Sequence, residues 1–394
     1  GHDTWEDGSA EVTGHTNVWA PMVVDEARGI VYAPVGTPSN DYYGGARPGD
    51  NLFAEALVAL DARTGERLWH FQTVHHGLWD FDLPGAPVLY TATVDGRRID
   101  AVAVAGKTGF VYAFDRVTGE PIWPIEERPV PPSDVPGERA APTQPFPTRP
   151  APFARQGFSE DDLISLTPEL NAAAREAVKG YRTGPLYTPP SLEGTIAMPG
   201  IIGGGNWGGV AVDPETSLLY VKATERPSLL KLAPADPERV VARYDLDREA
   251  RGLGVEGLPI TDPPWGTLTA IDMATGEHRW QVAAGDQPRI REHEALRGVA
   301  LPERLGLPGA PGGIVTRGGL VFLTGGGDVL YAHDKTTGEV LWEAPLPGRA
   351  YATPMTYATA DGRQFVVVAT GGGAAGGTLV AFALEEDVRG PEPL

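Results

Sequence analysis

Residues 59–69 read Ala-Leu-Asp-Ala-Arg-Thr-Gly-Glu-Arg-Leu-Trp, and this stretch decides the fold because its pattern returns along the chain. The shared pattern is Ala-x-Asp-x-x-Thr-Gly-x-x-x-Trp. Three further copies occupy residues 113–123, 270–280 and 332–342. A pattern that recurs with fixed internal spacing indicates a protein built from repeated structural units.

Each copy predicts a β-hairpin. The alternating residues before Asp61 form one strand, and the Asp61 side chain caps the turn. Gly65 takes the positive φ that ends the turn, and the next strand carries Trp69 to a buried face. Short strands repeated in this way are typical of a β-propeller, so we predict an all-β propeller with about five blades.

A weaker pattern, Asp-x-x-x-x-x-hydrophobic-Tyr, starts at Asp25 and at Asp213 and predicts another hairpin. The long interval between the second and third copies leaves room for an insertion plus further blades. Residues 127–197 fit such an insertion, because they begin Pro-rich and then turn helical. We treat them as an excursion within one propeller domain, residues 1–394.

Capping residues predict the helical part of this insertion. Ser159 is placed to cap a turn that carries three acidic residues. Thr167 followed by Pro168 predicts the start of a helix that runs to Lys179 and stops at Gly180.

Composition excludes several classes of function. The chain carries 52 acidic against 32 basic residues, a net charge of −20, so a nucleic acid is not an expected partner. The absence of cysteine excludes disulfides and thiolate metal sites. No apolar run is long enough to span a membrane. Because the chain opens at Gly1 within a polar segment, we expect any export signal or membrane anchor to lie upstream.

The hairpin repeat, together with Val-His-His-Gly-Leu-Trp-Asp-Phe-Asp-Leu-Pro at residues 74–84, resembles the pyrroloquinoline-quinone (PQQ) dehydrogenases, in particular the membrane glucose and quinate branch. The resemblance runs from about Gly14 to Leu384. Supporting stretches are residues 17–21, 142–146, 187–191, 206–209 and 352–357. The family folds as an eight-bladed propeller, so the resemblance implies that this chain is its C-terminal part. It also implies the periplasmic, extracytoplasmic face of the inner membrane.

The resemblance implies roles for five residues. Asp80 falls where the family has its catalytic base, and Lys107 matches the cation that contacts the quinone oxygens. Trp19 matches the tryptophan on which the planar cofactor lies, and Asn206 and Trp207 are expected in the same pocket. Judged without the family, Asp80 could cap a turn, Lys107 could be a solvated turn lysine and Trp19 could belong to the core.

The resemblance also implies a Ca²⁺ or Mg²⁺ ion, with Thr37, Asp80 and Asp82 as candidate ligands. Two departures weaken this set. Thr37 stands where the family has an Asn ligand, although Asn40 is close enough in sequence to compensate. Gly373 stands where glucose dehydrogenases have a His near the chain end. A further acidic ligand of the family belongs to the absent N-terminal blades.

The adjacent pair His75 and His76 could suggest a metal site, but the geometry of an extended chain argues against it. Adjacent residues of an extended chain point to opposite faces, so one ion is not expected to bind both. We expect one ring to pack or shape the substrate pocket and the other to hydrogen-bond to the backbone. The same alternation places Asp80 and Asp82 on one face.

These residues favour an enzyme that oxidises a sugar, polyol or alcohol by hydride transfer to the C5 carbonyl of PQQ. Its electron acceptor would be a membrane quinone or a cytochrome. Two alternatives stay open: a non-catalytic propeller with the same repeat that serves as a protein-interaction scaffold, and a paralogue with a vacant pocket. We also expect this part of a propeller to associate in solution, with residues 379–384 as its most exposed strand.

Overall fold

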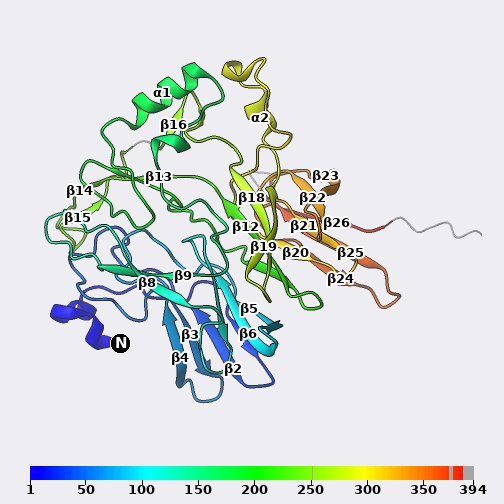
Figure 1. Cartoon of the computed structure of the whole chain (residues 1–394), viewed down its shortest axis with the longest axis horizontal. Coiled ribbons are helices and arrows are strands. Elements are labelled where there is room, and N and C mark those ends of the chain that lie inside the picture. The colour runs from blue at the N-terminus through cyan, green and yellow to red at the C-terminus, as the bar shows by residue number, and fades with distance from the viewer. Residues whose placement is uncertain (251, 372–375, 385–394) are drawn as a thin grey trace, which may run out of the picture.

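The computed structural model describes residues 1–250, 252–371 and 376–384, and it shows an arc of successive antiparallel sheets, seen in Figure 1. Five sheets of three or four strands follow each other along the described chain, as predicted. The first contains β1 (Val23–Asp25), β2 (Ile30–Pro34), β3 (Ala56–Asp61) and β4 (Arg67–Gln72). The second contains β5 (Val88–Val94), β6 (Arg97–Ala105) and β7 (Val111–Asp115).

The other three sheets lie in the C-terminal half. The third contains β11 (Val210–Asp213), β12 (Leu218–Thr224), β18 (Gly266–Asp272) and β19 (Glu277–Ala283). The fourth contains β20 (Gly313–Val315), β21 (Leu320–Leu323), β22 (Val329–Asp334) and β23 (Val340–Pro345). The fifth contains β24 (Met355–Ala358), β25 (Gln364–Thr370) and β26 (Thr378–Phe382). Within each sheet the strands pair in the order in which they occur along the chain, as in propeller blades, although residues 225–265 intervene between β12 and β18.

The repeated hairpins form as the pattern predicts. Asp61 Oδ1 accepts hydrogen bonds from the backbone N–H groups of Arg63 and Thr64, both at 2.9 Å. Gly65 has φ 74°, the left-handed conformation that a side chain disfavours. The weaker pattern also forms hairpins, β1–β2 after Asp25 and β11–β12 after Asp213.

The repeat tryptophans join one blade to the next. A methyl group added at Gly119 would lie 2.6 Å from the Trp69 ring, so this indole rests on the turn of the following repeat. Trp280 packs in the same way on the turn of the fourth repeat, at Gly338. Trp342, in the last copy, is 41% exposed and contacts Phe382 edge-on. The prediction that each repeat buries its tryptophan is therefore wrong for Trp342, because no later repeat turn follows it.

The predicted insertion is present. It contains β8 (Ile125–Pro129), β9 (Thr143–Pro147), η3 (Glu160–Asp162), α1 (Pro168–Val178) and β10 (Thr195–Ala197). Ser159 forms the capping box of η3, and the Thr167 hydroxyl accepts the N–H of Leu170 to cap α1. The helix ends at Val178, one residue before the predicted Lys179.

A second excursion, residues 225–265, was not predicted. It leaves the third blade between β12 and β18, which pair with each other, and it fills the interval where further blades were expected. Its short strands are β13 (Ser228–Leu230), β14 (Leu232–Pro234), β15 (Tyr244–Leu246), β16 (Gly254–Val255) and β17 (Leu258–Pro259). Because this segment lacks the Trp repeat, no sequence pattern distinguished it from a further blade.

Parts of both excursions meet, because α1 of the first and β16 of the second lie together with α2 at the top of Figure 1. The remaining short helices are η1 (His2–Thr4), η2 (Glu6–Glu11), α2 (Pro288–Arg291) and η4 (Glu294–Leu296). Side chains of α1 share a buried cluster with the second excursion, through Leu170, Val255 and Ile260. Among the described residues no helix combines the length and apolarity needed to cross a membrane.

Candidate functional site

The motif at residues 74–84 follows β4 and is not a strand. Asp80 has φ 58° and His76 has φ 48°, a backbone region that non-glycine residues seldom adopt. Such conformations persist where the surrounding structure over-determines them, and they cluster at functional sites. The neighbouring Trp79 and Phe81 are buried in the core between the first two blades, which fixes the segment.

One lysine lies between the two predicted acids. Lys107 Nζ lies 2.8 Å from Asp80 Oδ1 and 2.7 Å from Asp82 Oδ2. Both acids therefore face the same side, as predicted, but the reason was wrong: the positive φ of Asp80, rather than strand alternation, turns it there. The Lys107 side chain is only 8% exposed, so it is not the solvated turn lysine of the alternative interpretation.

Thr37 contacts this group through its backbone. Its N–H donates to Asp82 Oδ1 at 2.6 Å, whereas its hydroxyl lies 3.2 Å from Oε1 of Glu55. Glu55 is fully buried, and its Oε2 has no hydrogen-bond partner. Sequence reasoning missed Glu55; a lone acid at the start of the Ala-Leu-Val-Ala-Leu strand was the available signal.

Trp19 lies next to the acids. A methyl group added at Gly36 would come within 2.8 Å of Asp82 Oδ1 and 3.2 Å of the Trp19 indole, so both side chains meet over this glycine. The indole is 46% exposed. It is therefore an uncovered flat apolar surface beside a charged cluster, and the alternative of an ordinary core tryptophan is wrong.

Asn206 and Trp207 lie on a loop that packs against the Lys107 turn. Gly204 N–H donates to the Lys107 carbonyl at 2.7 Å, and Gly203 sits against the Lys107 side chain. The Asn206 amide donates to the Ile202 carbonyl, and Trp207 is 36% exposed. The structure thus brings the loop to the site, but the Asn206 side chain bonds to its own loop and not to Asp80 or Asp82.

A loop after β2 borders the site on a further side, which the sequence analysis did not predict. Tyr42 Oη lies 3.4 Å from Asp80 Oδ2. Asn40 does not take the place of a metal ligand, because its amide donates to Asp245 at 3.0 Å and its Oδ1 accepts the Tyr42 N–H. Asp245 belongs to the second excursion, so this bond ties the wall to a distant segment.

The two histidines have different partners, and His76 makes the backbone hydrogen bond that was predicted for one of them. His76 is buried, and its ring bonds to the Gly49 carbonyl at 2.7 Å and to Glu138 at 2.8 Å. His75 contacts Gln72 at 2.9 Å and Glu127 at 3.0 Å, nearer the surface. Both rings tie blade one to its own loops or to the first excursion, and neither contacts the acid pair.

Burial and charge set the ionisation of the cluster. Burial raises the pKa of Asp80, and the nearby charge of Asp82 adds to this against the opposing Lys107 ammonium. Burial also opposes ionisation of Asp82, but Lys107 and the Thr37 N–H outweigh it and lower its pKa. Burial raises the pKa of Glu55 to about 8. The pKa values of Asp80 and Asp82 are thus shifted in opposite directions, and Asp82 is the more readily ionised of the two.

The site has features that fit a planar cofactor and, in part, a cation. The exposed Trp19 indole offers a stacking surface, and the Lys107 ammonium offers a donor. The carboxylates of Asp80 and Asp82 are oxygen ligands of the kind that a hard ion takes. No cluster of three acidic or histidine ligands occurs within the described residues. Gly373 lies outside the described residues.

Comparison with protein families identifies the fold. The family model of the PQQ glucose, ethanol and alcohol dehydrogenase β-propeller domain matches residues 1–366. The chain belongs to the PQQ-dependent dehydrogenase β-propeller family. Pyrroloquinoline quinone with a divalent cation is the cofactor of this quinoprotein family.

Individual relatives agree with the glucose and quinate branch of the quinoproteins. The chain is 35% identical over 387 residues to a probable quinate dehydrogenase (quinone) of Xanthomonas campestris pv. juglandis, covering 93% of this chain and 49% of the relative. It is 34% identical over 405 residues to quinoprotein glucose dehydrogenase of Escherichia coli, covering 95% and 50%. The chain thus spans about half the length of these curated relatives.

A solved structure supports the quinoprotein fold. Quinohemoprotein alcohol dehydrogenase from Comamonas testosteroni matches with a TM-score of 0.64 at 24% identity, covering 97% of this chain and 50% of that chain. At this identity the likeness is one of fold alone.

Proposed function

We propose that the protein containing this chain is a PQQ-dependent dehydrogenase that oxidises a sugar, polyol or alcohol. The observation that carries the proposal is the group of Asp80, Lys107 and Asp82 beside the exposed indole of Trp19. When bound, PQQ supplies a carbonyl carbon that accepts hydride. The residues of this chain supply the proton acceptor, the charges and the stacking surface.

Asp80 acts as the general base. A base must be ionised and within hydrogen-bond reach of the substrate hydroxyl. Its Oδ1 is held by Lys107 at 2.8 Å, and its Oδ2 faces Tyr42 at 3.4 Å, so Oδ2 is the oxygen placed to take a proton. The pKa of Asp80, raised by burial, brings this carboxyl closer to the pH range in which general bases work best.

Lys107 and Asp82 prepare the cofactor side. The ammonium is a preorganised positive charge for a developing oxyanion, and Asp82 keeps that charge in position at 2.7 Å. Asp80, Asp82 and Thr37 are the residues of this chain that would hold Ca²⁺ or Mg²⁺. Thr37 would contribute after its hydroxyl turns away from Glu55. Asn206 and Trp207 would border the cofactor from the neighbouring loop.

Relatives suggest the substrate class, acceptor and location. Quinate, glucose and glycerol dehydrogenases are among them, and the quinate dehydrogenases are named as quinone-dependent. A small polyhydroxylated substrate fits a site with free carboxylate oxygens. We propose a membrane quinone or a cytochrome as the acceptor and the periplasmic face of the inner membrane as the location.

Reconstitution tests the proposal. The full-length protein that contains this chain is titrated with PQQ in the presence of Ca²⁺ or Mg²⁺, and the absorption spectrum and dye-linked oxidation of glucose, quinate, glycerol and ethanol are recorded. We expect stoichiometric cofactor binding that is lost on addition of a chelator. Tight binding that a chelator leaves unchanged would contradict the role of the cation.

The scaffold alternative predicts the opposite result of this reconstitution. A non-catalytic propeller needs only the Trp repeat, so Trp19→Ala and Lys107→Ala would leave all of its binding properties intact. The ion pairs of the buried Lys107 with two acids argue against it, because the desolvation cost of such pairs leaves little net stability for a scaffold to gain from them. Absence of PQQ binding by the wild-type protein would favour this alternative.

A further inference from the structure

The phenol of Tyr42 lies beside the proposed base and has no role in the reaction as described so far. Its Oη donates a hydrogen bond to Asp80 Oδ2 at 3.4 Å, and Oδ2 is the oxygen placed to take the proton of the substrate. Tyr42 is only partly buried, and the Asp80 side chain is 21% exposed, so neither group is sealed in the core. A substrate hydroxyl that donates to Oδ2 therefore lies next to this phenol.

Hydrogen bonds hold the loop that carries Tyr42. The backbone N–H of Tyr42 donates to Asn40 Oδ1 at 3.1 Å, and the Asn40 amide donates to Asp245 Oδ1 at 3.0 Å. Asp245 lies on β15 of the second excursion. The excursion thus holds the loop from outside, at the residue on which Tyr42 is hung.

A buried arginine joins the same loop to the segment of the base. The Arg47 side chain is fully buried, and its Nη2 donates to the Asn40 carbonyl at 2.7 Å and also to the Gly77 carbonyl. Gly77 lies three residues before Asp80. Because one rigid, planar guanidinium bonds to both segments, the separation of Tyr42 and Asp80 is set before a ligand binds.

The phenol can accept a hydrogen bond while it donates one. A tyrosine hydroxyl has a single donor, here directed to Asp80, and its oxygen lone pairs remain available as acceptors. Tyr42 Oη and Asp80 Oδ2 are therefore two neighbouring acceptors, 3.4 Å apart. Two hydroxyls on adjacent carbons of one substrate match this spacing, one donating to each acceptor. A hydroxyl on a more distant carbon of a ring does not.

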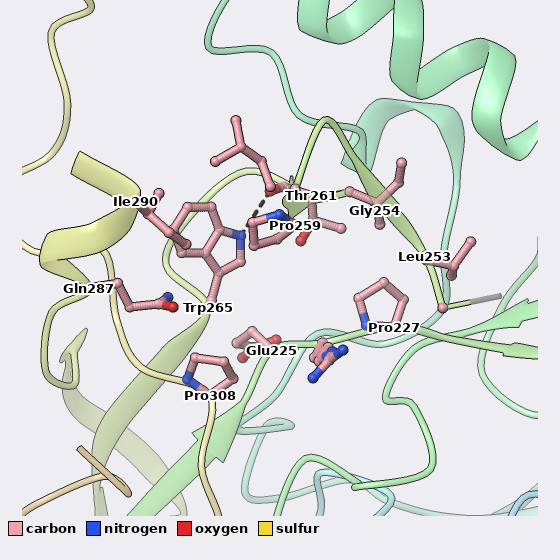
Figure 2. A pocket seen from close by; sticks show the side chains of 15 residues that line it. Glu225, Pro227, Leu253, Gly254, Pro259, Thr261, Trp265, Gln287, Ile290 and Pro308 are labelled. Atoms are coloured by element: carbon pink, nitrogen blue, oxygen red, sulfur yellow. Dashed lines mark hydrogen bonds between the residues drawn. The ribbon is translucent and has the colours of Figure 1, made fainter. Parts of the chain in front are cut away.

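The cavity of the second excursion offers no such pair. Figure 2 shows this cavity of about 390 Å³, which is lined mainly by glycine, proline and aliphatic residues. Its indole N–H, from Trp265, donates to the Thr261 carbonyl at 2.8 Å, drawn as a dashed line. Neither Asp80 nor Tyr42 lines the cavity, so it contributes no group to recognition of a hydroxyl at the base.

We propose that Tyr42 determines substrate specificity by accepting a hydrogen bond from the hydroxyl next to the reacting one, so that the enzyme selects vicinal diols over monohydric alcohols. The inference rests on the proposed dehydrogenase function and narrows its substrate class. The physical reason is that a site with a positioned partner for a substrate hydroxyl rejects the analogue that lacks the hydroxyl, because the polar group of the site then stays unpaired.

Three rigid cyclic alcohols test the proposal. They are cis-1,2-cyclohexanediol, cis-1,4-cyclohexanediol and cyclohexanol, compared by dye-linked kcat/KM in the full-length protein loaded with PQQ and Ca²⁺. The two diols carry the same number of hydroxyls, so a difference between them reports position alone. The wild type should prefer the 1,2-diol over both other substrates by at least about tenfold.

Tyr42→Phe removes the acceptor and keeps the ring. The ratio of kcat/KM for the 1,2-diol to kcat/KM for cyclohexanol should fall about fivefold, the loss of one hydrogen bond between neutral groups. Both substrates use the same base, so any effect of the substitution on Asp80 itself cancels in this ratio.

Tyr43→Phe is the matched control. The Tyr43 hydroxyl belongs to the neighbouring residue but donates to the Pro136 carbonyl at 3.0 Å, away from the base. This variant should keep the wild-type ratio. An equal fall in both variants would overturn the inference, because it would reflect a general disturbance of the loop.

The inference and the proposed function fail in different ways. Dye-linked turnover with no preference for the 1,2-diol, or with a preference that Tyr42→Phe leaves unchanged, would overturn the role of Tyr42 and leave the dehydrogenase function standing. Absence of turnover with these alcohols and with glucose, quinate and glycerol would contradict the function and, with it, the inference.

Discussion

Lys107 Nζ lies 2.8 Å from Asp80 Oδ1, and the two residues come from different places: a turn between β6 and β7, and an irregular segment after β4. The same ammonium lies 2.7 Å from Asp82. A lysine that pairs with the buried Asp82 and the partly exposed Asp80 holds both carboxylates in place, and it leaves Asp80 Oδ2 as the oxygen that can act on a substrate. The first two predictions depend on this geometry.

Asp80→Asn should retain PQQ binding and lose most turnover. The amide is nearly isosteric but cannot accept the proton, and loss of a general base typically lowers kcat by about 10²–10⁴. Steady-state kinetics with dye and spectrophotometric PQQ titration measure both properties. Asp61→Asn, in a hairpin turn where the carboxylate bonds to the backbone of Arg63 and Thr64, is the control and should stay active. Turnover of Asp80→Asn within tenfold of the wild type would remove Asp80 from the mechanism.

The pH profile should reflect the raised pKa of Asp80. Only the ionised carboxylate accepts a proton, so kcat/KM should rise with pH through that pKa, which burial and Asp82 hold above its ordinary value. Asp82→Asn removes one of the two causes, and the acidic limb should then move to lower pH. A limb that stays in place or moves to higher pH would show that another group controls it.

The buried Lys222 should make the free energy of unfolding of this protein depend on pH. It is buried, its Nζ donates to the Gly309 carbonyl at 2.6 Å, and burial lowers its pKa to about 7. Between that value and the ordinary 10.5 the unfolded chain binds more protons, so the free energy of unfolding should rise with pH, by at most about 1.4 kcal/mol per pH unit.

Lys222→Met should flatten this rise, measured by urea unfolding at several pH values from 7 to 10. Lys179→Met is the control, because that side chain is 72% exposed and belongs to no buried cluster. If both variants keep the slope of the wild type, the buried amine does not control the pH dependence.

The fifth sheet should drive association of this chain in solution. Leu379 on β26 is 76% exposed, and Met355 on β24 is 51% exposed. Within the described residues β26 pairs only with β25, so its other edge offers free backbone groups. Light scattering should detect species above the monomer mass, and Leu379→Lys should reduce them. A clean monomer of the wild-type chain over a wide concentration range would contradict this expectation.

Much of the fold followed from local patterns. The Asp61 to Trp69 hairpin, its later copies and the cap at Thr167 form as predicted, because turn chemistry and helix capping act over a few neighbouring residues. The second excursion was missed for the opposite reason. Its short strands are stabilised by packing against α1 and other distant segments, which local sequence does not encode.

For the candidate site, the sequence by itself determined the residue types and, through the family resemblance, which acids and which lysine to consider. Only the tertiary structure decided that Lys107 lies between Asp80 and Asp82, that Thr37 turns its hydroxyl toward Glu55, and that Tyr42 faces the base. The physical reason is distance along the chain. Contacts between loops of different blades depend on how the blades pack and on backbone conformations such as the positive φ of Asp80, neither of which spacing reveals.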